Sequence, residues 1–178
     1  GLAYDAQGNL WMTNYEMDKV LKVLKKDGTW ASLFDANFSE ASTPERIMVD
    51  KDNHVWVTSR RSTSVQSGLY GLDFGGTPDN TADDRGVFRS AAINEDGTKC
   101  ELLEIKDICQ DLTGQIWFGC ASGVYAVENP ESWFKTSAFS VYQPKVPRND
   151  GTNYADYLLT GIDVTALVVD QGNRKWLG

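Results

Sequence analysis

Short apolar runs alternate with polar turns along this chain, and four of the turns share one pattern. In each, an apolar run leads into an Asp, and a Trp follows six residues later. This pattern predicts a β-hairpin whose first strand ends at the Asp and whose second strand carries the Trp. Gly8, Gly114 and Gly172, with Asn53 and Asn173, are expected to supply left-handed backbone in the turns. The four copies span residues 5–11, 50–56, 111–117 and 170–176.

The segments between these hairpins predict further strands. Apolar runs that read as strands lie at 20–24, 29–33, 68–72, 87–88, 123–127 and 139–142. The Trp-to-Trp steps of 45, 61 and 59 residues fall in the period range of propeller blades. The chain is therefore predicted to be all-β: one partial β-propeller over residues 1–178, with three complete four-stranded antiparallel blades and a partial one. The repeats are placed at about 2–46, 47–107, 108–166 and 167–178.

The hairpin resembles the two-component regulator propeller repeat, in which an apolar strand, Asp, Gly-Asn, an apolar residue and Trp follow one another. Segments 76–85, 146–159 and 170–178 more specifically resemble PorZ-like proteins of Bacteroidota. These are cell-envelope proteins built from propellers and a small β-sandwich, and one branch serves type IX secretion. The resemblance implies a non-catalytic binding or scaffolding module, in the periplasm or on the outer-membrane surface, that recognises a glycan, lipopolysaccharide or protein partner. It also implies an alternative, the periplasmic ligand-sensing propeller of a hybrid two-component histidine kinase.

Three and a half repeats do not close a ring, since propellers have 4–8 blades. We therefore expect the chain to be a portion of a longer one, or two copies to associate through the unpaired edges about a two-fold axis.

The net charge and the motifs present in the sequence reduce the number of function classes that the chain can belong to. The net charge of −8 argues against nucleic acid as a partner, and no apolar stretch approaches the length of a membrane span. No nucleophile elbow, phosphate loop or zinc pattern is present. His54, the single histidine, lies in a hairpin turn and is expected to be solvated. We predict no enzyme activity, cofactor or metal, although 25 acidic residues leave a propeller glycosidase or lyase open as an alternative.

Three insertions, at 59–67, 91–99 and 143–161, are expected to open on one rim of the blades and to form a binding surface. Tyr rings there suit stacking on sugars, Asn and Asp suit hydroxyl groups, and Arg suits phosphate or carboxylate. The alternative is that 143–161 only covers the neighbouring blade. The candidate ligand-binding residues are Arg60, Arg61, Arg148, Asn149, Asp150, Asn153, Tyr154, Asp156 and Tyr157.

A fourth insertion, at 74–86, is expected on the opposite face. Its Asp79, Asp83 and Asp84 offer oxygen ligands for Ca²⁺, or are neutralised in part by Arg85 without a metal. Cysteines are three in number and lack metal-ligand spacing, so we expect free, packed thiols at Cys100, Cys109 and Cys120.

Overall fold

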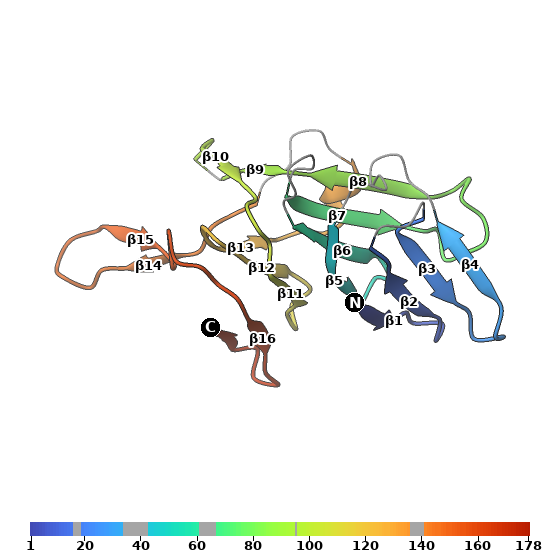
Figure 1. Ribbon diagram of the computed structural model, residues 1–178. Coiled ribbons are helices and arrows are strands. Elements are labelled where there is room, and N and C mark those ends of the chain that lie inside the picture. Colours follow the sequence, from blue (N-terminus) through green and yellow to red (C-terminus); the bar gives the residue numbers. More distant parts are fainter. Residues whose placement is uncertain (16–18, 34–42, 61–66, 95, 136–140) are drawn as a thin grey trace.

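The computed structural model describes residues 1–15, 19–33, 43–60, 67–94, 96–135 and 141–178. Within these residues the helices and strands comprise β-strands and one helical turn, α1 (Ser132–Lys135). The strands form small antiparallel sheets that follow one another along the chain, and Figure 1 shows them side by side. The predicted all-β fold of an incomplete propeller is confirmed. In the described part of the chain, no helix has the length and apolar character needed to cross a membrane.

The first two sheets are four-stranded blades whose strands pair in chain order. The first blade consists of β1 (Leu2–Tyr4), β2 (Leu10–Thr13), β3 (Leu21–Leu24) and β4 (Trp30–Leu33). The second consists of β5 (Thr43–Val49), β6 (Val55–Arg60), β7 (Gly68–Asp73) and β8 (Arg85–Arg89). A β-bulge interrupts the pairing of β5 with β6 between Pro44 and Ile47. These sheets confirm the predicted blades in this half of the chain.

The third sheet has three strands, β11 (Asp107–Gln110), β12 (Ile116–Cys120) and β13 (Gly123–Val127). The strand predicted at 139–142 is represented by Tyr142, which forms a single antiparallel bridge to Ala126. Residues 139 and 140 lie outside the described residues. The last hairpin pairs β16 (Leu167–Val169) with β17 (Lys175–Leu177), as the partial fourth repeat predicts.

Two rim insertions form hairpins of their own. The first pairs β9 (Ala91–Ile93) with β10 (Lys99–Glu101), and the second pairs β14 (Lys145–Pro147) with β15 (Ala155–Tyr157). In Figure 1 the second hairpin extends away from the blades. The sequence predicted loops at both places.

The first strand of each repeat lies next to the first strand of the following repeat. β1 contacts β5, β5 contacts β11, and β11 contacts β16. The apolar core fills the space between blades: Trp11 packs on Phe74 of the second repeat, with ring centroids 4.7 Å apart. Burial of these aromatic rings between sheets is the main force that orders the blades.

Helix α1 links the third repeat to the second blade. Trp133 is fully buried, lies edge-on to Trp56 with ring centroids 5.3 Å apart, and donates from its indole nitrogen to Val87 O at 3.1 Å. Gly71 leaves the space for this ring, because a Cβ at that position would lie 2.9 Å from it. The helical turn thus closes the seam between neighbouring blades.

The four Asp–Trp hairpins share one hydrogen-bonding arrangement. In the second copy, Asp50 Oδ1 accepts the backbone N–H groups of Asp52 and His54, while Oδ2 accepts the indole N–H of Trp56 at 2.9 Å. The other three copies repeat these bonds, with indole-to-carboxylate distances of 2.9, 3.1 and 3.1 Å for Trp11, Trp117 and Trp176. The constant step of six residues therefore places an indole donor against a carboxylate. The predicted equivalence of Trp11, Trp56 and Trp117 is confirmed.

The left-handed residue of each turn is the third after the Asp. These residues are Gly8, Asn53, Gly114 and Asn173, with φ of 87°, 71°, 96° and 61°. The expectation for Gly172 was wrong: it lies one position earlier in the fourth turn, where its neighbour Asn173 adopts the left-handed conformation.

Neighbouring hairpins are tied together by side-chain amides. Asn53 Oδ1 accepts the N–H of Ala6, and Asn173 Oδ1 accepts the N–H of Leu112, both at 2.9 Å. In the third turn Gly114 occupies the corresponding position, and Gln110 instead accepts the N–H of Lys51 at 2.7 Å. Each junction therefore joins the backbone just after the Asp of one copy to an amide of the next.

Candidate binding surfaces

Most of the predicted ligand-binding residues lie together on the β14–β15 hairpin. Arg148 follows β14 and forms a bidentate ion pair with Asp156 on β15, at 2.8 and 2.6 Å, and its guanidinium lies 6.0 Å from the ring centroid of Tyr154. Asn149 and Gly151 turn the chain with positive φ, and Asp150 caps the turn by accepting the N–H and hydroxyl of Thr152. An isolated two-stranded hairpin is marginally stable in water, so these contacts serve first to hold its shape.

The base of this hairpin is fixed to the β9–β10 hairpin. Tyr157 donates its hydroxyl to Asp96 Oδ2 at 2.7 Å, and Lys145 lies 4.9 Å from the Tyr157 ring centroid. The Thr98 N–H and the Tyr157 hydroxyl together lower the pKa of Asp96 to about 2, while the bond to Asp96 raises the pKa of Tyr157. Thus two of the three insertions that were predicted on one rim meet.

The tip of the hairpin presents polar groups and one aromatic ring. Asn149, Asn153 and Tyr154 are exposed, and 69% of the Tyr154 surface is accessible. The tip therefore offers amide groups and a stackable ring beside the Arg148–Asp156 pair. That the tip binds a ligand remains a prediction.

Arg60 lies apart from this hairpin. It ends β6 and forms an ion pair with Glu45 Oε1 at 2.7 Å, whereas the hairpin residues pair with one another and with Asp96. Arg61 lies outside the described residues. Among the described residues, Arg60 forms no hydrogen bond or ion pair with the β14–β15 hairpin.

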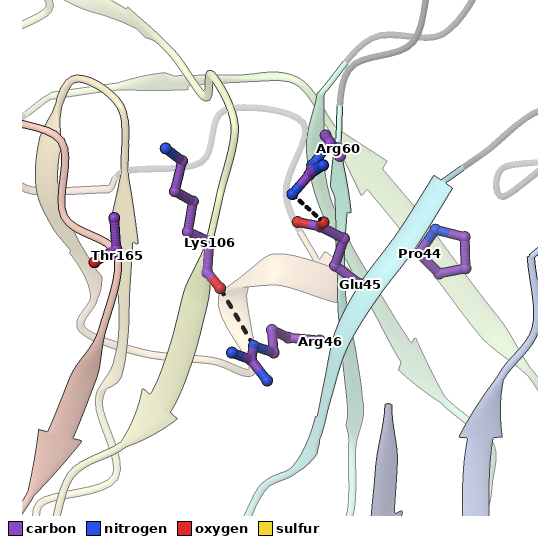
Figure 2. A pocket seen from close by; sticks show the side chains of 6 residues that line it. All are labelled: Pro44, Glu45, Arg46, Arg60, Lys106 and Thr165. Atoms are coloured by element: carbon purple, nitrogen blue, oxygen red, sulfur yellow. Dashed lines mark hydrogen bonds and ion pairs between the residues drawn. The ribbon is translucent and has the colours of Figure 1, made fainter.

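Arg60 lines a second surface, an open pocket of about 450 Å³ at the start of the first strands of the second, third and fourth repeats (Figure 2). We call it the inner-strand pocket. Arg46 lies in the bulge of β5, Lys106 immediately precedes β11, and Thr165 precedes β16. The pocket is lined by Pro44, Glu45, Arg46, Arg60, Lys106 and Thr165.

Sequence reasoning missed the other lining residues of this pocket. Arg46, Lys106 and Thr165 lie four or five residues before the Asp of their respective hairpins. A similar distance from the repeated Asp was the available signal, since corresponding positions on neighbouring first strands lie close together.

The acidic insertion carries separate polar contacts. Asp79 pairs with Lys25 at 2.6 Å, Asp83 accepts the Thr77 hydroxyl at 3.2 Å, and Arg85 pairs with Asp73. Contacts to Lys25 place this insertion beside the hairpin turns, away from the rim insertions. Among the described residues, no group of three His, Cys, Asp or Glu side chains has the geometry of a metal site.

His54 was expected in solvent, and that expectation was wrong. Its ring is buried, with Nδ1 3.0 Å from Asp50 Oδ2 and Nε2 3.2 Å from Glu131 Oε1, and it lies 4.8 Å from the Phe134 ring. Burial opposes the charged ring, but the hydrogen bond and charge of Asp50 outweigh it, so the pKa of His54 is raised. The polar side chain after the turn is a partner of the hairpin Asp here and in two other copies, at Asn9 and Arg174.

All three cysteines are free thiols, as predicted. Cys120 is buried, and Cys100 and Cys109 are half-buried. Burial, followed by the charges of Asp107 and Asp111, raises the pKa of Cys109 to about 12. These thiols are therefore protonated at neutral pH and poor nucleophiles.

Comparisons with known proteins agree with this architecture. No protein-family model and no curated protein sequence matches the chain. Among solved structures, it is similar to PorZ of Porphyromonas gingivalis, described as an essential bacterial surface component of the type IX secretion system. The TM-score is 0.89 at 24% identity, over 99% of this chain and 24% of PorZ. The chain has the fold of a segment of PorZ.

A second solved structure is more distant. The extracellular domain of the hybrid two component system BT3049 from B. thetaiotaomicron matches with a TM-score of 0.56 at 14% identity, over 99% of this chain and 20% of that one. The chain thus spans about a quarter or less of either neighbour. Both neighbours were expected from the resemblance of the hairpin repeat.

Proposed function

We propose that this chain is a non-catalytic binding and scaffolding segment of a bacterial cell-envelope protein, which recognises a glycan, lipopolysaccharide or protein partner during type IX secretion. The observation that carries the proposal is the similarity to PorZ, with a TM-score of 0.89 over 99% of the chain. The neighbours are described as a surface component and an extracellular domain, which supports a place at the periplasm or the outer-membrane surface.

The surface best suited to this role is the tip of the β14–β15 hairpin. It stands away from the blades and exposes Asn149, Asn153 and Tyr154 (Figure 1). An aromatic face beside amide donors and acceptors can stack on a sugar ring and bond its hydroxyl groups. Arg148 and Asp156 hold the tip in place, so little conformational entropy is lost when a partner binds.

The pocket chemistry supports a non-catalytic role. Glycoside hydrolysis requires a pair of carboxyl groups across the scissile bond. Glu45 is the single carboxylate among the described residues that line the inner-strand pocket, and Arg60 already pairs with it. This argues against the glycosidase or lyase alternative.

A genetic experiment tests the proposal. In the bacterium that encodes the chain, we expect loss of the protein to leave type IX cargo inside the cell. A variant with Asn153→Ala and Tyr154→Ala should fail to restore export, whereas Trp30→Ala, an exposed aromatic on β4, should restore it. Normal export without the protein would refute the secretion role.

The sensor alternative is supported by the BT3049 match and predicts a different result. Loss of the protein would then change transcription in response to an added polysaccharide and leave cargo export unaffected. Measuring secreted cargo and transcripts in the same strains separates the two functions.

A further inference from the structure

One cation of the inner-strand pocket, Arg46, has a long ion pair and, among the described residues, no hydrogen bond to a carboxylate. Arg46 Nε lies 3.4 Å from the carbonyl oxygen of Lys106 and 3.8 Å from Asp107 Oδ1, and the second distance is too long for a hydrogen bond. In the described part of the chain, no nearer carboxylate faces this guanidinium, and 61% of its side chain is exposed.

The other two cations of the pocket are already paired. Arg60 bonds Glu45 at 2.7 Å, and Lys106 bonds Asp163 at 2.5 Å. Asp107 uses Oδ2 to accept the N–H of Leu167 at 2.8 Å. Each carboxylate around the pocket therefore already bonds another donor at shorter range than Arg46, and the fork of Arg46 is available for a carboxylate from outside.

The backbone supports this assignment of Arg46. The residue lies in the bulge of β5 between Pro44 and Ile47, and bulges recur beside functional sites because they redirect a side chain out of the regular alternation. Figure 2 shows the guanidinium below the backbone of Lys106, with the Arg60–Glu45 pair beyond it.

The remaining lining groups suit hydroxyl groups. Glu45 bonds Arg60 through Oε1, and Thr165 donates its hydroxyl to Gly178 O at 3.2 Å, so each retains acceptor capacity. A volume of about 450 Å³ lies within the usual range of small-ligand pockets. Pro44 is the single apolar residue of the six that line it, whereas peptide recognition relies on apolar anchors or strand pairing.

We propose that the inner-strand pocket binds an acidic sugar, whose carboxylate is held by the guanidinium of Arg46 and whose hydroxyl groups reach Glu45 and Thr165. The assignment deepens the proposed function by naming a ligand class, and it adds a site separate from the β14–β15 hairpin.

Titration of the full chain with sodium glucuronate tests the site, followed by calorimetry and by the NMR signals of the Arg Nε–H groups. We expect saturable binding of glucuronate. Glucose and acetate should each bind at least about tenfold more weakly, because glucose lacks the carboxylate and acetate lacks the hydroxyl groups. Arg46→Ala should weaken glucuronate binding by about tenfold or more. Arg46→Lys, which keeps the charge but not the fork, should give an intermediate loss.

Arg174→Ala is the matched control, because it removes an exposed Arg in the turn of the last hairpin, at the other end of β16 and β17 from Thr165, and should leave glucuronate binding unchanged. Equal binding of glucuronate and glucose, or an unaltered affinity in both Arg46 variants, would overturn the proposal. Tighter binding of a hexaglutamate peptide than of glucuronate would overturn it in favour of an acidic peptide. Cargo export in the Asn153→Ala and Tyr154→Ala variant is measured independently, so failure of this site and failure of the proposed function can be told apart.

Discussion

Asp50→Asn tests whether the Asp–Trp hydrogen bonds stabilise the blades. The Asp50 side chain has no solvent exposure and accepts four bonds, two on each oxygen. Asn keeps the oxygen that bonds the backbone but places an NH₂ group against the indole N–H of Trp56. A buried donor without an acceptor costs roughly 1–3 kcal/mol, and bonds to a charged group are about twice as strong as neutral ones. We expect a loss of about 2–4 kcal/mol in the free energy of unfolding.

The fourth hairpin supplies the matched control. Asp170 makes the same bonds, but Trp176 is 59% exposed, so water can replace the lost acceptor. Asp170→Asn should cost less than about 1 kcal/mol. Urea denaturation monitored by circular dichroism measures both variants.

A double-mutant cycle isolates the bond itself. Trp56→Phe removes the indole donor, so the combined variant should lose roughly 1–2 kcal/mol less than the sum of the two single changes. Equal losses in Asp50→Asn and Asp170→Asn, or additive effects in the cycle, would show that the step from Asp to Trp serves packing alone.

Three further outcomes are expected. The pKa of His54 is raised by Asp50, with smaller effects from Asp73 and Glu131. The stabilising contribution of the charged ring is therefore complete below pH 6.5 and is lost as pH rises through the folded pKa. Urea midpoints between pH 6 and 9 should fall in the wild type and stay flat in His54→Gln. Tyr157→Phe should speed amide hydrogen exchange in the β14–β15 hairpin with little change in melting temperature, and unchanged exchange would show that the bond to Asp96 does not anchor it. Cys109 should react with iodoacetamide at pH 8 more slowly than an unhindered thiol, since its pKa is about 12; reaction at the rate of free cysteine would contradict this environment.

The repeated hairpin was predictable because its determinants are local. Asp5, Gly8 and Trp11 lie within a single hairpin, and each copy repeats the six-residue step from Asp to Trp. The polar residue after the turn was misjudged because four different side chains occupy that position. The role that Asn9, His54 and Arg174 share, as side-chain partners of the Asp, appears once the hydrogen bonds of the carboxylate are known.

The candidate surfaces were harder to predict because their residues meet across blades. Tyr157 and Asp96 are 61 positions apart, and Arg46 and Lys106 are 60 apart, so no local pattern connects them. The β14–β15 hairpin was also hidden by Pro144 and Pro147, which favour a loop by their lack of a backbone donor. Arg60 was predicted on one rim with the 148–157 loop, but it pairs with Glu45 in the inner-strand pocket, and that partner was not predicted.

The amide ties between hairpins have a consequence for how such an array can evolve. One side of each tie is a backbone N–H, which every residue at that position except proline supplies, and the other is an Asn or Gln that belongs to the following unit. A duplicated unit therefore brings the acceptor for the unit before it and offers a donor to the unit after it, whatever its other side chains are. Gene duplication can lengthen the array by whole units without correlated changes elsewhere, and the side chains around the ties remain free to diverge.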